Sequence, residues 1–296
     1  MLMGSCFTAN IGNYLQDLFF TSSHNPTGIL FDARSVARHL GYYMDRKSFD
    51  QKDLAKQDDL HYHWDFHSSF SSVRAGETIR RINGAISDGH EKLKECRWLI
   101  ITLGTSFSYF LKEEGIYVAN NHKAAANRFE KHLVGIDEML REFSDVLDRL
   151  FEFNNDLHVL FTVSPVRHIR DGVIENNRSK ARLLELVHTL RDKYKAVEYY
   201  PSYELLIDVL RDYRFYDADM VHPNYAATRY VFEHFCETWM DDFTRQWLPE
   251  LGSLATSLNH KALHPETRAH QNFLQQRTKR IHELAKIFTW VNWGER

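Results

Sequence analysis

The sequence predicts a single α/β domain built as a three-layer sandwich, with helices packed on a parallel β-sheet. Continuous apolar runs indicate buried strands at residues 97–104, 158–165 and 196–201. Segments with the 3.6-residue apolar spacing of amphipathic helices separate these runs. Strands that alternate with helices are typical of parallel βαβ units, and 296 residues suffice for one domain with a core of ordinary size.

The elements before the first run follow from spacing and turn residues. A helix is predicted just after Gly4-Ser5-Cys6-Phe7, with its buried face at Ile11, Tyr14, Leu15, Leu18 and Phe19. Asn25 to Gly28 form a turn signal, and a short helix is expected over 35–40. Residues 42–74 are rich in charge, histidine and aromatic residues with weak periodicity, so we expect an irregular insertion there, followed by a helix over 78–94.

Further helices are predicted over 136–151 and 179–193, between the strands. From Pro223 the chain is predicted to be helical to its end, with a break at 248–265. Residues from about 240 to 296 then form a helical extension of one domain that spans 1–296. A strand ahead of Ser5 needs about five residues, and only Met1 to Gly4 precede it. The first strand is therefore expected to be truncated at the N-terminus.

The composition excludes several classes of protein. The formal net charge is -3 at pH 7, without a basic tract or an acidic tail, so no nucleic-acid or membrane-surface partner is expected. No apolar run of about 18 residues and no signal-peptide pattern occurs, so no membrane span is predicted. The cysteines Cys6, Cys96 and Cys236 are odd in number and widely spaced. This pattern favours a reducing compartment over a disulfide framework, and a cytoplasmic location is expected.

Polar residues gather in the loops where the strands end, which is where open parallel sheets carry their reactive groups. Asp219 and His222 lie three residues apart in the last such loop. This spacing lets a carboxylate hold one imidazole nitrogen while the other nitrogen faces outward. Asp58 and His61 share the spacing, but only the first pair lies at a predicted strand end. Ser5, between a glycine and a helix, fits either a helix N-cap or a nucleophile.

Other candidates allow two interpretations each. Cys6 is either a rival nucleophile near a helix N-terminus or a packing residue. Arg167 and His168 follow a strand, and they either bind polar groups of a substrate or lie in a solvated loop. Asn120 either supplies an amide donor or caps a helix. A histidine cluster lacks a cysteine or a clear fourth ligand, so we predict no metal there; its members are His61, His63 and His67.

Several ordered sequence blocks fit one known family. They are GSCF at the start, NPTGILFD near residue 25, LGTSFSY at 103, VANNHK at 118, TVSPVRHIRDG at 162, SKARLLE, and YYPSYELLIDVLRDYRFYDADMVHP. Over nearly its whole length the chain thus resembles the GSCFA-domain family, a branch of the SGNH/GDSL hydrolase superfamily. The resemblance implies a flavodoxin-like sandwich with five parallel strands and a Ser-Asp-His triad. In that triad Ser5 is the nucleophile, His222 the base and Asp219 its orienting carboxylate.

The resemblance also implies an oxyanion hole made by the N–H of Ser5, the N–H of Gly28 and an asparagine side chain. The block that usually reads Gly-x-Asn-Asp is Gly104-Thr105-Ser106-Phe107 in this chain, so its asparagine is absent. We assign the third donor to Asn120, with Asn25 or Thr105 as alternatives.

These features predict a serine hydrolase that cleaves acyl esters through an acyl-enzyme. By analogy with the family, small acyl groups on carbohydrates or similar polyols are the expected substrates. The alternatives are an O-acyltransferase on the same scaffold and a catalytically silent binding module. No cofactor is required. The expected partner is a small-molecule or carbohydrate ester, with no nucleic acid and no membrane, and the sequence does not predict an oligomeric state.

Overall fold

The computed structural model describes residues 1–291 and 293. The chain divides into two compact units. One contains residues 1–10 and 23–231, and the other contains residues 11–22 and 232–296. All the candidate site residues predicted from the sequence belong to the first unit.

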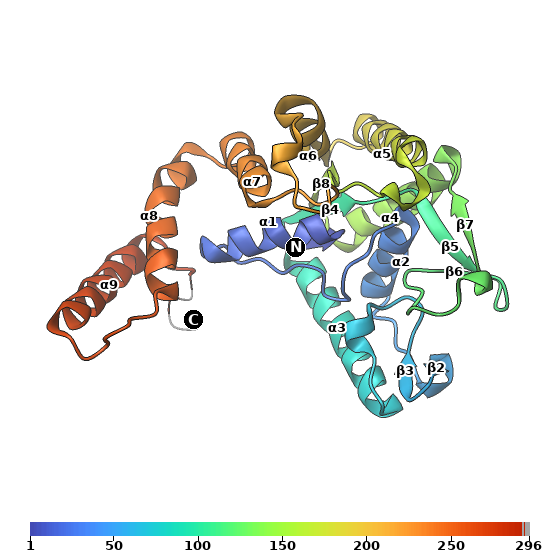
Figure 1. Ribbon diagram of the computed structural model, residues 1–296, viewed down its shortest axis with the longest axis horizontal. Helices are drawn as coiled ribbons and strands as arrows, with labels where there is room; N and C mark the ends of the chain where they lie inside the picture. The colour runs from blue at the N-terminus through green and yellow to red at the C-terminus, as the bar shows by residue number, and fades with distance from the viewer. Residues whose placement is uncertain (292, 294–296) are drawn as a thin grey trace. The chain divides into compact units, whose positions relative to one another are not determined.

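The first unit is an α/β fold around a parallel sheet, seen at the centre of Figure 1. Its strands are β1 (Leu2–Gly4), β4 (Trp98–Leu103), β8 (His158–Val163) and β9 (Val197–Tyr200), in the order β1-β4-β8-β9. Every neighbouring pair is parallel, and Gly4, Thr102, Thr162 and Tyr200 lie in register across the sheet. The three apolar runs of the sequence are therefore confirmed as strands, and their carboxyl ends lie at one edge of the sheet.

Residues 23–25 lie along the edge of β1 that faces away from β4, and they pair with β1 only at Leu2. Leu2 donates its N–H to the Ser23 carbonyl at 2.8 Å and accepts the Asn25 N–H at 2.9 Å, and a single parallel bridge joins Leu2 to His24. The family resemblance implied five parallel strands; among the described residues this sheet has four, and residues 23–25 lie where a fifth would start. The Asn25 to Gly28 turn follows at once, so it is held against the end of β1.

Helices separate the strands, as predicted, and two more follow the last strand. They are α1 (Cys6–Asp17), α2 (Ala33–Met44), α3 (Ala75–Glu95), α4 (Ile136–Phe153), α5 (Val173–Lys193), α6 (Ser202–Glu204), which continues as a π-helix over Leu205–Leu210, and α7 (Tyr225–Trp239). Alternate strand residues such as Ile101 and Phe161 are fully buried. They share one core with Val36 of α2, Phe143 of α4 and Leu186 of α5, because side chains alternate between the faces of a sheet.

Two stretches contain strands that the sequence did not predict. Residues 42–74, expected to be irregular, include a hairpin of β2 (Ala55–Gln57) and β3 (Leu60–Tyr62). A separate antiparallel sheet, visible beside the main one in Figure 1, follows β4. Its strands are β5 (Phe107–Leu111), β6 (Ile116–Val118) and β7 (Phe129–Leu133), in the order β6-β5-β7.

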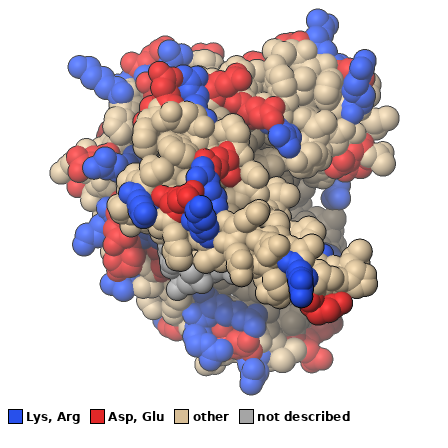
Figure 2. Space-filling model, turned by 90° about the vertical axis from the view of Figure 1, so that its left-hand side faces the viewer, with Lys and Arg blue, Asp and Glu red and all other residues tan. Residues whose placement is uncertain are grey.

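The second unit is helical. Its helices α8 (Asp242–Asn259) and α9 (Arg268–Ile287) share a core that includes Leu251, Leu254 and Leu284. The break predicted at 248–265 was placed too early, because α8 continues through Pro249 and ends only at Asn259. No helix in the part of the chain that the structure describes is both long and apolar enough to span a bilayer. On the face drawn in Figure 2, acidic and basic side chains lie interspersed.

Candidate functional site

Ser5 occupies the single position between β1 and α1. The backbone of Gly4 has φ +130°, and a Cβ there would lie 2.1 Å from the Thr102 carbonyl oxygen, so only glycine fits this turn. Ser5 is 1% exposed. Its Oγ does not cap the helix: the Thr8 N–H donates instead to the Ser5 carbonyl at 3.0 Å, and the Oγ has no hydrogen-bond partner among the described residues. Most buried hydroxyls have a partner, and Thr8, Ser22 and Ser35 also lack one among the described residues, so it is the place of Ser5 at the carboxyl end of β1 in the parallel sheet that singles it out.

Asp219 and His222 meet as their spacing predicted. Their loop is closed by an antiparallel bridge between Tyr216 and Pro223. His222 Nδ1 donates to Asp219 Oδ2 at 2.6 Å, while Asp219 Oδ1 accepts the N–H groups of Val221 and His222 at 2.9 and 3.0 Å. These bonds lower the pKa of Asp219 to about 2, and the bond from the His222 main-chain N–H has the largest effect. The carboxylate is therefore ionised, and it fixes the tautomer in which Nε2 of His222 accepts a proton.

A chain of neighbours connects the Ser5 turn with the His222 loop. A Cβ on Gly104 would lie 3.4 Å from the Cβ of Ser5, and the Gly104 N–H donates to the Phe31 carbonyl at 3.0 Å. The Phe31 ring meets the His168 ring edge-on, with 6.2 Å between centroids. The loop of His168 contacts that of His222 directly, because the Arg167 N–H donates to the Val221 carbonyl at 3.2 Å. The loops that follow β1, β4 and β8 thus lie beside the loop that carries His222.

Helix α5 is hydrogen-bonded to the loops that follow β4 and β8. Lys180 is 1% exposed, and its Nζ donates to the Gly104 and Ser164 carbonyls at 2.7 and 2.6 Å. Burial lowers the pKa of Lys180 to about 7. Ser179 Oγ accepts the Ser106 N–H at 2.8 Å, and Asn176 Oδ1 accepts the His168 N–H at 2.8 Å. These contacts fix the loops after β4 and β8.

The sequence reasoning missed these α5 residues. A signal was present, because Asn176, Ser179 and Lys180 continue the apolar face of the predicted helix through Leu183 and Leu186 at spacings of three and four residues. Polar residues on the buried face of a helix indicate that its end lies under a site rather than in the apolar core.

The predicted oxyanion donors have different surroundings. The Ser5 N–H donates to the Thr102 carbonyl at 3.1 Å and the Gly28 N–H to the Asn25 carbonyl at 2.9 Å, so both amides are engaged within the backbone. Asn120 is engaged elsewhere: its N–H donates to Trp64, and its Oδ1 accepts the N–H of His122.

Asn25 carries a side-chain amide that is fixed next to Ser5. Its Oδ1 accepts the Gly4 N–H at 2.9 Å, which places the side chain within one residue of Ser5. Its Nδ2 is buried, and within the described chain no acceptor lies in hydrogen-bond range of it. The backbone of Asn25 has φ +47°, a left-handed conformation that asparagine tolerates better than most residues. Asn25 therefore presents an uncommitted N–H donor beside the candidate nucleophile.

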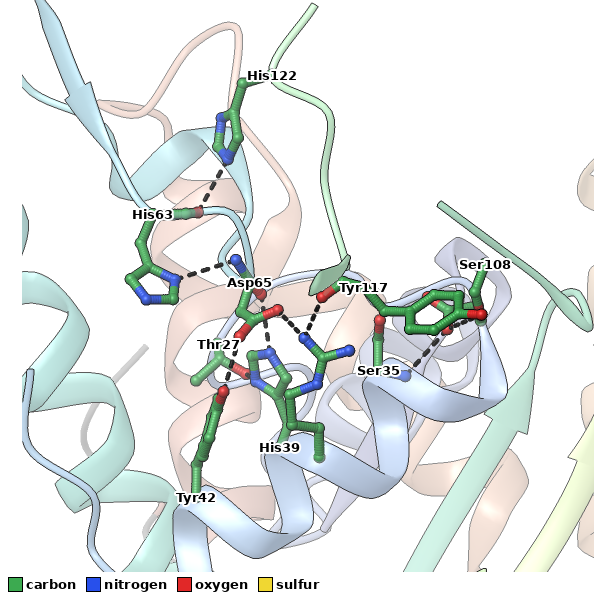
Figure 3. A network of polar contacts seen from close by, with 11 residues as sticks. Thr27, Ser35, His39, Tyr42, His63, Asp65, Ser108, Tyr117 and His122 are labelled. Atoms are coloured by element: carbon green, nitrogen blue, oxygen red, sulfur yellow. Dashed lines mark hydrogen bonds and ion pairs between the residues drawn. The ribbon is translucent and has the colours of Figure 1, made fainter. Parts of the chain in front are cut away.

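A buried polar network anchors the turn that contains Asn25 (Figure 3). Thr27 Oγ1 lies 2.8 Å from His39 Nδ1 and 2.6 Å from the Tyr43 hydroxyl. His39 Nε2 lies 2.8 Å from the Asp65 carbonyl oxygen, which can only accept. His39 Nε2 therefore carries the proton and Nδ1 accepts from Thr27. Burial lowers the pKa of His39 to about 4, so the ring stays neutral and the turn is held by a network with fixed donor directions.

The histidine cluster has structural contacts of its own. His63 Nδ1 accepts the Asp65 N–H at 3.1 Å, and His67 Nδ1 accepts the Ser69 N–H at 3.2 Å. In residues 1–291 and 293, no group of three or more histidine, cysteine or acidic side chains is arranged to hold a metal ion.

The fold and the site define an α/β protein that gathers a buried serine, an Asp-His pair and an uncommitted amide in loops at the carboxyl edge of a parallel sheet. Comparison with known families agrees with the resemblance of the sequence blocks. Residues 1–235 match the GSCFA family, and residues 251–296 match the GSCFA domain protein, C-terminal domain. The chain belongs to the GSCFA family. A search of curated proteins found no match.

Proposed function

We propose that this chain is a serine hydrolase of the SGNH type, with a three-layer sandwich, that cleaves acyl esters. The observation that carries the proposal is the combination of a buried Ser5 Oγ without a partner and a His222 ring held by ionised Asp219 in the neighbouring loop. The first feature is costly to maintain, since a buried hydroxyl loses its hydration, and a nucleophile with its base explains both features.

In the proposed reaction, Ser5 Oγ attacks the ester carbonyl while His222 Nε2 takes its proton. Asp219 stabilises the imidazolium that forms. His222 then gives the proton to the leaving alcohol, and a water molecule activated by the same nitrogen hydrolyses the acyl-enzyme. The side chains of His222 and Asp219 are each 49% exposed, so water reaches the base, which favours hydrolysis over transfer to another hydroxyl.

We assign the side-chain oxyanion donor to Asn25 rather than Asn120. Two observations support this assignment. The Asn25 side chain is fixed by the N–H of Gly4, the residue before Ser5, and its buried Nδ2 has no acceptor among the described residues. A donor of this kind gains its partner only when negative charge develops on the carbonyl oxygen. Asn120, by contrast, has its contacts at Trp64 and His122.

Ser5 is a better nucleophile than its neighbour Cys6. Burial raises the pKa of the Cys6 thiol above its ordinary value, and a thiol that stays protonated at neutral pH reacts slowly. The hydroxyl of Ser5 needs no prior ionisation, because His222 removes its proton during attack.

The test is labelling by a fluorophosphonate probe together with hydrolysis of short-chain nitrophenyl esters. We expect wild type to label and to hydrolyse, and Ser5→Ala and His222→Ala to lose both activities. His61→Ala is the matched control, because His61 shares the Asp-x-x-His spacing but lies elsewhere, and it should behave as wild type. A folded wild-type protein that neither labels nor hydrolyses would support the silent binding module instead.

A further inference from the structure

We propose that Arg167 binds an anionic group of the substrate, a carboxylate or a phosphate close to the scissile ester. This inference rests on the proposed hydrolase function and adds the substrate class to it.

Arg167 is tied to the catalytic loop through its main chain. It follows β8, and its N–H donates to the Val221 carbonyl at 3.2 Å, next to His222 in the chain. Its position relative to the base is therefore set by the backbone and does not depend on a flexible side chain. The guanidinium in turn packs on Tyr216, which forms an antiparallel bridge with Pro223, next to His222, so a group bound there would lie beside the loop of the base.

Two tyrosine rings fix the guanidinium plane. The Arg167 Cζ lies 4.4 Å from the ring centroid of Tyr216 and 5.1 Å from that of Tyr213. Tyr216 is buried, while Tyr213 is 59% exposed, so the stack reaches from the core to the surface. An arginine that packs on aromatic rings through its guanidinium face can still donate from the edge of that group to a ligand. The side chain is thereby pre-organised, which reduces the entropy lost on binding.

This arginine lacks a carboxylate partner, in contrast to two other shielded arginines of the same unit. Arg34 forms an ion pair with Glu142 at 2.7 Å, and Arg38 forms one with Asp65. Over the described ranges, 1–291 and 293, no acidic side chain lies within ion-pair distance of Arg167. A half-buried cation without a counter-ion is costly, and a substrate anion would remove that cost.

Two acidic groups of the adjoining loops are already engaged. Asp219 accepts the His222 ring and two main-chain N–H groups, and Asp171 pairs with Lys131. His168, next to Arg167, has its pKa lowered to about 4, chiefly by burial. It is therefore a neutral hydrogen-bond partner at pH 7 and adds no competing positive charge. An anion at this edge would meet Arg167 as its counter-ion and His168 as a second polar contact.

The experiment compares esters that differ only in one charge. Para-nitrophenyl hemisuccinate and para-nitrophenyl butyrate test an anion on the acyl side, because a carboxylate replaces the terminal methyl group. Para-acetoxybenzoate and its methyl ester test an anion on the alcohol side, with release of the phenol as the readout. For wild type we expect kcat/KM to favour the charged member of one pair by about 10- to 100-fold, the range of a charge-assisted hydrogen bond.

Three variants test whether Arg167 causes the preference for the charged ester. Arg167→Met should abolish it by lowering kcat/KM for the charged ester more than for its neutral partner. Arg167→Lys keeps the charge but loses the fork of donors, so part of the preference should remain. Arg170→Met is the control, since Arg170 is exposed in the same loop, and it should retain the full preference. An arginine that only supports the loop would instead lower the rates for both members of a pair equally.

The outcomes separate the two proposals. Wild-type turnover that requires Ser5 but shows no preference in either pair, or a preference that survives Arg167→Met, overturns the anion inference and leaves the hydrolase proposal standing. If no ester is cleaved and no probe labels the folded protein, the hydrolase proposal fails and the anion inference fails with it.

Discussion

The substitution Asn25→Asp isolates the proposed oxyanion donor. Aspartate keeps an oxygen that can accept the Gly4 N–H, which Asn25 Oδ1 now accepts at 2.9 Å, and it also tolerates the left-handed backbone at this position. It replaces only the buried Nδ2, which has no acceptor within the described chain. The variant loses the N–H that would meet the developing negative charge, and an ionised carboxylate at this buried position would also repel that charge, so the expected loss is at least that of one donor.

Loss of one oxyanion donor lowers kcat by about 10² to 10³, or about 3 to 4 kcal/mol of transition-state stabilisation. KM should change little, because the donor acts only in the transition state. The assay is steady-state hydrolysis of a nitrophenyl ester, with thermal unfolding as a check on folding. Asn120→Asp is the matched control and should keep wild-type kcat. The assignment is refuted if Asn25→Asp keeps kcat within threefold, or if Asn120→Asp loses as much.

Three further predictions concern the supports of the site. Burial lowers the pKa of Lys180 from 10.5 to about 7, so between these pH values the unfolded chain binds more protons and wild-type stability should rise with pH, by about 5 kcal/mol over the full window. Urea unfolding at about pH 7 and about pH 9 should show this rise in wild type and a smaller one in Lys180→Met. Asp219→Asn should lower kcat by about 10⁴ through the wrong His222 tautomer, whereas Asp58→Asn should leave it unchanged; equal losses would point to a general effect on folding. In Gly104→Ala the new Cβ would lie 2.7 Å from a backbone oxygen, which should cost about 1 to 3 kcal/mol of unfolding free energy, while Gly84→Ala, with open space around it, should be neutral or stabilising by less than about 1 kcal/mol.

The strands of the main sheet could be predicted because burial on both faces produces continuous apolar runs, as in Trp98–Leu103 and His158–Val163. The antiparallel sheet of β5 to β7 could not be predicted in the same way. Its strands are three to five residues long and include charged and exposed positions, as in Phe129–Leu133. Such strands depend on pairing with distant residues, and local sequence carries little trace of that pairing.

In the second unit, the predicted break begins earlier than the end of the helix in the structure. Pro249 lies inside the break predicted at 248–265, and proline removes a helical hydrogen bond. Helix α8 nevertheless continues past it, with an N-cap in which Asp241 accepts the Thr244 N–H at 2.6 Å. Packing of Leu251 and Leu254 in the helical core stabilises the turns that follow. Tertiary packing thus outweighs a local propensity.

For the site, too, contacts that depend on local spacing could be predicted and contacts that depend on the fold could not. The contact between Asp219 and His222 follows from local spacing and was predicted. Asn25 as the preferred donor and Lys180 as the support of two loops depend on which segments of the chain the sheet brings together. Only the structure shows that the Asn25 side chain is fixed next to Ser5 by the Gly4 N–H, while Asn120 lies against Trp64 and His122.

The most direct test of the proposed function is the position of the covalent adduct that a fluorophosphonate probe forms. Wild-type protein is labelled, digested and analysed by mass spectrometry of the N-terminal peptide, which contains both Ser5 and Cys6. We predict one adduct per chain, carried by Ser5, and no adduct in His222→Ala. An adduct on Cys6 or on any other residue, or labelling that persists in Ser5→Ala, would contradict the assignment of Ser5 as the nucleophile.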